Sequence, residues 1–289
     1  MAITSQNIEQ AAADIEGAQA NNYQIQPLSK TIPGLNQTHG YEIAAAIKDI
    51  RVHDRRAIVV GRKIGFTNRN IWPEYNIDAS NWSYMYDSTV VDLERDGITK
   101  SDGPVDVDIR QFSNIEPRIE PEIVLGISGN ISSSMSDEEI LQNISWIAHG
   151  FEIVASIYPN WKFTAADTTA AFALHGKLLI GPRIPVSQLT PAPGDDLLHQ
   201  LSSFNILLLQ NDNSVDEGRG SNVLGSPIKA LRHLLELLES DRLNAPLQAG
   251  EIVTTGTLTR ALPIEDGDVW STQLSGIGLR GLRVRFRTQ

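Results

Sequence analysis

The sequence predicts an α+β fold, in which a helical N-terminal region over residues 1–87 packs on a larger mixed β domain over residues 88–289. Two observations support this prediction. Apolar residues in the first third recur at helical spacing, whereas from about Ser88 onward they alternate with polar residues or form short runs between turn residues. The chain shows no internal repeat and no low-complexity tract, and its 289 residues suffice for one large domain with a smaller accessory one.

Two helices and one strand are expected in the N-terminal region. Thr4 or Ser5 can cap a helix that runs to about Ala20. Its apolar face would consist of Ile8, Ala11, Ala12 and Ile15. The stretch "HGYEIAAAIKDIRVHDRR" repeats the helical pattern, and "AIVVGRKIGFT" after it is expected to be a buried strand broken by Gly61 and Gly65.

Strands and two further helices are expected in the larger region. The expected strands are "VDVDIRQF", "IVLGISGNI", "FEIVASIY", "KLLIGPRIPV", "SSFNILLLQND" and much of the C-terminal forty residues. Ser136 and Glu139 form a capping box for a helix that Gly150 is expected to end. A second helix is expected after Ser226, with proline in its first turn. Its buried face would consist of Leu231, Leu234, Leu235 and Leu238.

Charge and composition exclude several classes of function. The formal net charge is −11 and the pI about 5.0, which argues against nucleic-acid binding and against an anionic membrane surface. The chain has no cysteine, so it has no disulfide, thiolate metal site or cysteine nucleophile. No signal peptide and no apolar run of about 20 residues is visible, and we expect a cytoplasmic protein.

The stretch "IEPRIEPEIVLGI" contains the sharpest local feature of the sequence. In a strand, Glu120 and Glu122 share one face, and Ile119, Ile123 and Leu125 share the other. Two buried carboxylates repel each other, and a divalent cation such as Mg²⁺, Mn²⁺ or Ca²⁺ would relieve that repulsion. A solvated strand face, or ion pairs with Arg110 or Arg118, would explain the acids equally. Because Pro121 cannot donate a hydrogen bond, we expect this segment to be an edge strand or irregular.

Two further charged residues lie in apolar surroundings. Glu152 in "FEIVASIY" either forms an ion pair or joins Glu120 and Glu122 as a third metal ligand. Lys63 in "VVGRKIGFT" either extends its ammonium to solvent or points into a pocket, where it would pair with a substrate carboxylate or carry a proton. His39, His149 and His175 are expected at the edges of elements, where most histidines are structural.

Six motifs in order resemble one protein family. They are "GRKIGFT", "PRIEPEIVLGI", "GFEIVASI", "NWKF", "GSNVLGSP" and "VTTGTLTRALPIEDGD". Together they resemble the 2-keto-4-pentenoate hydratase and 4-oxalocrotonate decarboxylase branch of the fumarylacetoacetate hydrolase superfamily, over about residues 38–286. The resemblance implies a mixed β-sandwich or β-roll core, with a helical N-terminal region and a catalytic domain over residues 88–289.

The resemblance also implies a set of site residues. Glu120, Glu122 and Glu152 match the positions that hold Mg²⁺ or Mn²⁺. Lys63 matches a lysine near the substrate carboxylate. The remaining matches are Asp87, an acid within the pocket that could move a proton, and Phe66 and Thr257, which would bind substrate. His175 stands in "AAFALHG", which replaces a stretch of small polar residues in the family, and it is a third candidate for proton transfer.

The implied function is a metal-dependent hydratase that adds water to a 2-hydroxy-dienoate or 2-oxo-enoate. The alternatives are a decarboxylase of the 4-oxalocrotonate type and a C–C hydrolase of an acylpyruvate. Two alternatives are not enzymes: a non-catalytic partner subunit and a structural metal-binding protein. The presence of Lys63 beside the three acids disfavours both. The expected partners are a small 2-oxo acid and further copies of the chain in a homo-oligomer, with a paired decarboxylase–hydratase complex as a further arrangement.

Overall fold

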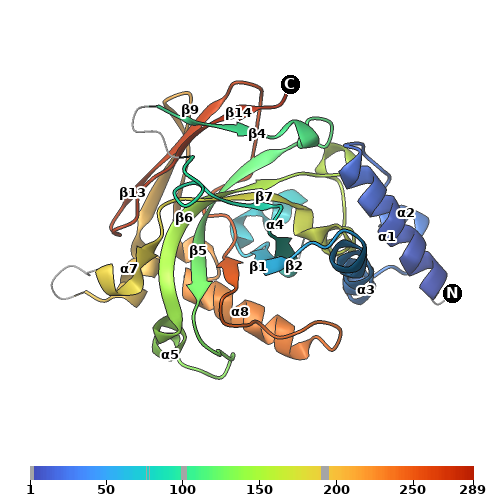
Figure 1. The fold of residues 1–289 in the computed structure, drawn as a ribbon, viewed down its shortest axis with the longest axis horizontal. Helices are drawn as coiled ribbons and strands as arrows, with labels where there is room; N and C mark the ends of the chain where they lie inside the picture. The colour runs from blue at the N-terminus through green and yellow to red at the C-terminus, as the bar shows by residue number, and fades with distance from the viewer. Residues whose placement is uncertain (1–2, 76, 78, 99–102, 190–194) are drawn as a thin grey trace.

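The structure is a computed structural model that describes residues 3–75, 77, 79–98, 103–189 and 195–289. Two mixed β-sheets form its centre (Figure 1). The strands of the nine-stranded sheet are β1 (Val59–Gly65), β2 (Asn81–Tyr86), β3 (Val90–Asp92), β5 (Arg118–Ile127), β6 (Ile144–Val154), β7 (His175–Ile180), β8 (Ile184–Pro185), β11 (Ile252–Thr254) and β12 (Leu262–Pro263). The strands of the five-stranded sheet are β4 (Val105–Asp108), β9 (Asn205–Gln210), β10 (Asn213–Arg219), β13 (Val269–Ser275) and β14 (Arg283–Arg287).

Both sheets mix parallel and antiparallel pairs. The parallel pairs are β1 with β11, β3 with β7, and β14 with β4. The two sheets share a buried apolar core to which β5, β6 and β7 contribute from one side and β4, β9, β13 and β14 from the other. Sheet-on-sheet packing of this kind agrees with the predicted β-sandwich. The predicted boundary after residue 87 stays a prediction, and the structure adds that β1 and β2, which precede it, are strands of the large sheet.

Eight α-helices occur in the described part of the chain. They are α1 (Ser5–Ala20), α2 (Leu28–Thr31), α3 (Gln37–Asp49), α4 (Trp72–Tyr75), α5 (Asp137–Gln142), α6 (Ala165–Ala170), α7 (Leu197–Ser203) and α8 (Pro227–Ser240). None of them is long and apolar enough to cross a membrane. The predictions of α1 and α8 are confirmed, including their caps: the Thr4 side chain accepts from the backbone N–H of Asn7, and that of Ser226 accepts from Lys229.

The predicted helix over residues 136–150 is wrong beyond its first two turns. The capping box of Ser136 and Glu139 is present, but α5 ends at Gln142 and the chain enters β6 at Ile144. Gly150 lies within β6, where its lack of a side chain lets the carbonyl of Leu179 approach: a Cβ at Gly150 would lie 2.9 Å from that oxygen. The segment "ISWIAHGFEIV" is therefore one continuous strand of eleven residues.

The segment at Pro121 was expected to be an edge strand or irregular, and it is irregular but not at an edge. β5 is a central strand with β6 on one flank and β11 and β12 on the other. The second flank is interrupted at Pro121, whose carbonyl accepts a hydrogen bond of 2.9 Å from the backbone N–H of Leu258 in the segment between β11 and β12. Since the nitrogen of an extended residue points to the same flank as its carbonyl, the missing N–H removes no bond to β6. The irregularity that the proline predicts is present, but it lies inside the sheet.

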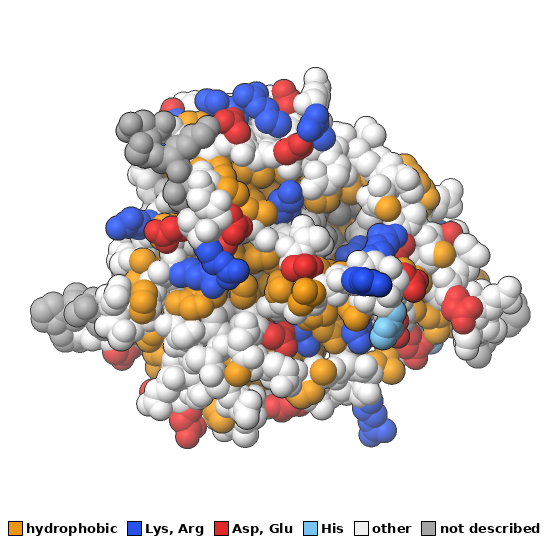
Figure 2. Space-filling view, in the orientation of Figure 1, with side chains coloured by type: hydrophobic (Ala, Val, Ile, Leu, Met, Phe, Trp, Pro, Cys, Tyr) orange, Lys and Arg blue, Asp and Glu red, His pale blue; other side chains and the backbone are white. Residues whose placement is uncertain are grey.

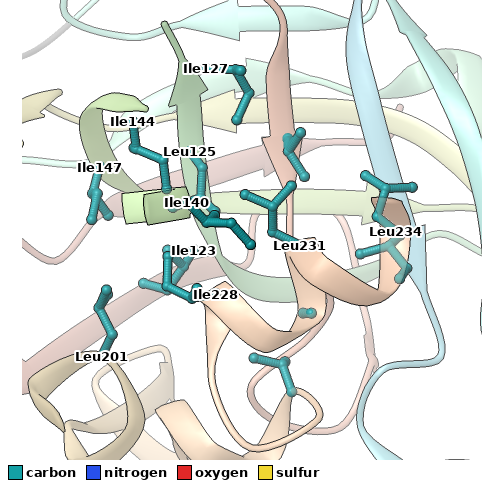
Figure 3. Packing of buried hydrophobic residues seen from close by; sticks show 14 of the residues in the cluster. Ile123, Leu125, Ile127, Ile140, Ile144, Ile147, Leu201, Ile228, Leu231 and Leu234 are labelled. Atoms are coloured by element: carbon teal, nitrogen blue, oxygen red, sulfur yellow. The ribbon is translucent and has the colours of Figure 1, made fainter. Parts of the chain in front are cut away.

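Helix α8 packs on one face of the large sheet. Ile123, Leu125 and Ile127 of β5 belong to the same apolar cluster as α8, and Figure 3 shows Leu231 of α8 near Leu125 and Ile140. The opposite face of β5 carries the glutamates. A second apolar cluster joins α1 and α3 to α6 and to the turn at residues 172–174, and this turn precedes β7 directly (Figure 1).

The packing of α8 gives a stability prediction. We expect Leu231→Ala to lower the free energy of unfolding by about 2–5 kcal/mol, because this fully buried side chain would leave a cavity against β5. Chemical denaturation measures the change. The matched control is Leu243→Ala, at a side chain that is 54% exposed, which should change stability by about 0.5 kcal/mol or less. Equal losses in both variants would contradict the packing of α8 described above.

Candidate functional site

The register between β5 and β6 brings three glutamates together. The strands are antiparallel, and Glu120 lies directly opposite Glu152. Glu122 lies two residues further along β5, so its side chain points to the same face. One carboxylate oxygen from each residue lies within 4.8 Å of the other two. The structure thus brings together the three acids that the sequence predicts as a group.

The cluster lies largely out of solvent. The side chains of Glu122 and Glu152 are fully buried, whereas Glu120 is half-buried. Glu120 is also the member of the cluster that lines a small pocket, so it marks the side from which a ligand can approach. Three carboxylates this close and this buried are unfavourable unless protons or cations neutralise them.

The pKa values reflect this conflict. Burial raises the pKa of Glu120 to about 7, and burial with the charges of Glu152 and Glu120 raises the pKa of Glu122 well above its ordinary value. Burial would raise the pKa of Glu152 as well, but the charge of Lys63 and the hydrogen bond with His175 outweigh burial and lower that pKa to about 2. Glu152 is therefore ionised in the folded protein. Glu120 and Glu122 can both be ionised only when a further cation is present.

The oxygen atoms of the cluster fit a divalent cation. Within the described residues, Oε1 of Glu122 and Oε2 of Glu152 have no hydrogen-bond partner, although the latter forms an ion pair with Lys63. The second oxygen of Glu122 accepts a hydrogen bond of 2.8 Å from the backbone N–H of Gly256, which fixes the carboxylate. A set of ligands made only of carboxylate oxygens suits hard divalent cations. Glu120, Glu122 and Glu152 could hold such an ion.

Lys63 lies beside the cluster on β1. Its Nζ is 3.1 Å from Oε2 of Glu152 and donates a hydrogen bond of 2.9 Å to the carbonyl of Ala173. β1 pairs with β2 and β11, so the lysine projects from the interior of the sheet. Burial alone would lower the pKa of Lys63, but the charges of the three glutamates, Glu152 foremost, raise it. The ammonium therefore keeps its proton.

A strained turn supplies the carbonyl that Lys63 contacts. Phe172, Ala173 and Leu174 have positive φ angles of 57°, 49° and 63°. The left-handed region costs a residue with a Cβ about 1 kcal/mol or more, so three in succession need strong support from their surroundings. All three residues are buried, and Phe172 and Leu174 lie in the apolar cluster with α1 and α3. This packing holds the Ala173 carbonyl against the lysine.

His175 follows the turn and contacts the cluster from the other side. Its Nδ1 lies 2.7 Å from Oε1 of Glu152, and its Nε2 lies 2.9 Å from the hydroxyl of Thr89. With both ring nitrogens engaged, the imidazole orients Glu152. It does not line the pocket beside Glu120, and its predicted part in proton transfer stays a prediction.

Asp87 is not brought to the cluster. It lies on the exposed turn after β2, where its Oδ1 accepts hydrogen bonds from the backbone N–H groups of Ile58 (3.1 Å) and Ser88 (3.0 Å). The resemblance implies an acid within the pocket at this position. In the structure, the Asp87 carboxylate instead stabilises a turn through these backbone hydrogen bonds. Asp87 lines a different cavity.

An apolar pocket opens onto the cluster at Glu120. Its lining consists of Lys63, Gly65, Phe66, Ile71, Tyr75, Glu120, Val154, Trp161, Ala173, Leu174, Gly256 and Thr257. Phe66 and Thr257, both predicted to bind substrate, are among these residues. The pocket is narrow, with a free volume of about 20 Å³. Tyr75 packs between Phe66 and Trp161 at ring-centroid distances of 6.2 and 5.9 Å, so these three rings form an aromatic wall.

Two features of the site were missed by the sequence interpretation. The aromatic wall combines Tyr75 of α4 with Trp161, residues far apart in sequence, and the only signal was an unusual density of aromatic residues in "IWPEYNIDASNWSYMYD". His149 was expected at an element edge, but β6 buries it, and its Nδ1 donates to the carbonyl of Glu122 at 2.9 Å. Burial lowers the pKa of His149 to about 4, so the ring is neutral and supports the backbone of β5.

Comparison with known proteins shows related chains over nearly the whole length. The family model described as fumarylacetoacetate (FAA) hydrolase C-terminal matches residues 73–285. A 2-keto-4-pentenoate hydratase of Paraburkholderia xenovorans (strain LB400) is 27% identical over 288 residues, covering 99% of this chain and 97% of that protein. A 2-hydroxyhexa-2,4-dienoate hydratase of Comamonas testosteroni is 26% identical and covers 88% of both chains.

Solved structures share the fold. The 4-oxalocrotonate decarboxylase from Pseudomonas putida G7, complexed with magnesium and adipate, superimposes with a TM-score of 0.83 at 22% identity and covers 99% of both chains. The fumarylpyruvate hydrolase from Pseudomonas aeruginosa, in complex with Mn²⁺ and pyruvate, gives a TM-score of 0.57 at 14% identity, over 80% of this chain and 91% of that one.

The cluster predicts stabilisation by a divalent cation. We expect Mg²⁺ or Mn²⁺ to raise the Tm of the protein, because an ion bound only by the folded state stabilises it and removes the repulsion among the acids. Glu122→Gln should lose most of this increase and change the Tm little without metal, since the raised pKa of Glu122 already keeps that carboxyl protonated when no ion is bound. Thermal denaturation with and without the ion measures both. Glu138→Gln, at an exposed acid of α5, is the control and should behave as the native chain. An unchanged metal response in Glu122→Gln would contradict the assignment.

Proposed function

The chain belongs to the fumarylacetoacetate hydrolase family, and from that premise we propose that it is a lyase that adds water to a 2-oxo-enoate formed from a 2-hydroxy-dienoate. The observation that supports the proposal is that one pocket is lined both by charged residues and by apolar ones. Glu120 and Lys63 line it beside the three-glutamate cluster suited to Mg²⁺ or Mn²⁺, and most of its other lining residues are aromatic or aliphatic. The hydratase names of the full-length relatives agree with this reading.

The polar end suits the 2-oxo acid group. When bound, Mg²⁺ or Mn²⁺ would supply positive charge for the carboxylate and the 2-oxo oxygen, and would stabilise negative charge that develops on that oxygen. Lys63 keeps its proton, because the glutamates raise its pKa. It is therefore suited to pair with the substrate carboxylate rather than to act as a base. The Gly256 N–H and His175 hold Glu122 and Glu152 in place.

The apolar end suits the hydrocarbon tail. Phe66, Tyr75 and Trp161 would exclude bulk water from the diene and hold it flat. In the reaction, a proton first moves to the far end of the diene, which yields the 2-oxo-enoate. The oxygen of water then bonds to carbon 4, and a proton is placed on carbon 3. Of the three residues considered for proton transfer, Lys63 lines this pocket and Asp87 and His175 do not.

The main alternative is decarboxylation of a substrate with a second carboxylate. Such a group would need a cation near the aromatic end. Among the described lining residues Lys63 is the only cation, and Glu152 already pairs with it. Arg118 lies just behind this wall, but its guanidinium donates to the hydroxyl of Tyr75 at 2.8 Å and stacks over Trp161. These contacts favour a hydratase over a decarboxylase. The His–acid pair of the cluster, His175 with Glu152, does not line this pocket, so the described lining offers no such pair to activate water for C–C hydrolysis.

The assembly of the protein stays a prediction. A homo-oligomer, and a complex that pairs a decarboxylase with a hydratase, rest on the family resemblance alone. A non-catalytic partner subunit is a weaker reading, since Lys63 and the three glutamates meet as a catalytic role requires.

An assay with two substrates tests the proposal. We expect the Mg²⁺-loaded protein to consume 2-hydroxypenta-2,4-dienoate with loss of the diene absorbance and no release of CO₂. A 2-hydroxy-dienoate that carries a second carboxylate should be turned over at least about 10-fold less efficiently in kcat/KM, because the described pocket offers no free cation to its tail.

Two controls separate the outcomes. Removal of the metal by a chelator should abolish turnover, and Lys63→Met should lower kcat/KM by about 100-fold or more, because the variant loses the cation for the substrate carboxylate. Faster CO₂ release from the dicarboxylate than hydration of the monocarboxylate would instead assign a decarboxylase. A protein that acts on neither substrate would support the non-catalytic reading.

A further inference from the structure

A second and larger cavity lies on the other side of His175 from the glutamates. Its volume is about 490 Å³, within the range of small-molecule sites. Its walls come from α1, from residues 51–57 after α3, from the turn at residues 86–89, and from the start of β7. It shares no lining residue with the pocket at Glu120, so it is a separate site.

The charged groups of this cavity are mainly cations. Arg51, Arg55, Arg56 and Lys177 line it, against the two carboxylates of Glu16 and Asp87. Glu16 is shared by Arg51 and Arg55, at 2.6 and 2.9 Å. Arg56 forms no ion pair within the described residues, whereas Lys177 donates a hydrogen bond of 3.4 Å to the carbonyl of Asp108. Figure 2 shows Lys and Arg side chains beside a hollow on this face, and this excess of positive charge lies on a chain of net charge −11.

Tyr86 supplies a buried polar group without a partner. The residue is 1% exposed and lines the cavity, and its hydroxyl makes no hydrogen bond within the described residues. Arg51 lies over its ring, 5.2 Å from the centroid. A buried hydroxyl without a partner costs about 1–3 kcal/mol. The unpaired hydroxyl of Tyr86 beside a cationic cavity therefore points to a hydrogen-bond acceptor on a bound ligand.

The remaining walls are mixed: Gln19, Gln111 and Thr89 supply polar side chains, and one part is apolar. Phe112, Ile115 and Ala155 contribute the apolar part. A ligand that matches both kinds of wall has a compact anionic group and a short hydrocarbon body. A carboxylate accepts hydrogen bonds from a guanidinium and from a phenol at the same time, whereas a bare inorganic ion would leave the apolar wall without contact.

We propose that this cavity is a binding site for a small organic carboxylate, distinct from the pocket at the three glutamates. The anionic group is held by the hydroxyl of Tyr86 and by the side chains of Arg51 and Arg56. The hydrocarbon part lies against Phe112, Ile115 and Ala155. The site does not depend on which reaction the enzyme catalyses, because none of these residues lines the pocket at Glu120.

Calorimetry on the Mg²⁺-loaded protein with succinate as the probe tests the proposal. Tyr86→Phe removes only a hydroxyl that has no partner in the chain, so folding should be unaffected. We expect it to weaken succinate binding about 5-fold, and Arg56→Gln to weaken it about 10-fold, as loss of a neutral and a charge-assisted hydrogen bond implies. Succinate that binds at the glutamate cluster would bind both variants as tightly as the native chain. A loss of affinity in the variants therefore measures binding in this cavity.

Matched controls are Tyr23→Phe and Arg242→Gln, at exposed residues outside the cavity. Both should bind succinate within about 2-fold of the native chain. Equal affinity in all five proteins, or equal weakening by the Arg242 control, would overturn the proposal. Binding of inorganic phosphate with the same dependence on Tyr86, but not of succinate, would overturn its organic part and leave a site for an inorganic anion.

Discussion

The structure depends on the placement of Glu120 opposite Glu152 in the ladder between β5 and β6, with Glu122 on the same face. Burial raises the pKa values of Glu120 and Glu122, and the repulsion of the neighbouring carboxylates raises them further. This arrangement is unfavourable for the chain by itself and favourable for a chain that binds a divalent cation. Much of the surrounding structure holds the acids in this position.

The supporting contacts come from segments far apart in sequence. Lys63 of β1 pairs with Glu152, and the carbonyl that anchors this lysine belongs to a buried turn with three successive left-handed residues. His175, directly after that turn, contacts Glu152 from the opposite side, and the backbone of Gly256 holds Glu122. The helices α1 and α3 pack on the turn. The N-terminal helices thus support the turn that anchors Lys63.

Much of this was predictable from the sequence, because it rests on local patterns. Alternation in "RIEPEIVLGI" predicts that Glu120 and Glu122 share a face, and helical spacing and caps predict α1 and α8. The errors have non-local causes. Gly150 was expected to end a helix, but it pairs with Ile180 of β7 and belongs to β6. Asp87 lies at an expected distance along the chain, but the turn that holds it faces a different cavity. Periodicity does not show which side of a sheet the aromatic wall covers, nor that Tyr75 and Trp161 meet.

The three glutamates are arranged as the ligands of one divalent cation would be. The most direct measurement is a crystal structure of the Mn²⁺-soaked protein, with the ion located by its anomalous scattering. We predict one strong peak with an oxygen of each of Glu120, Glu122 and Glu152 within about 2.0–2.6 Å, the range for hard cations with carboxylates. No peak at this cluster, or a peak bound only by surface acids, would contradict the account.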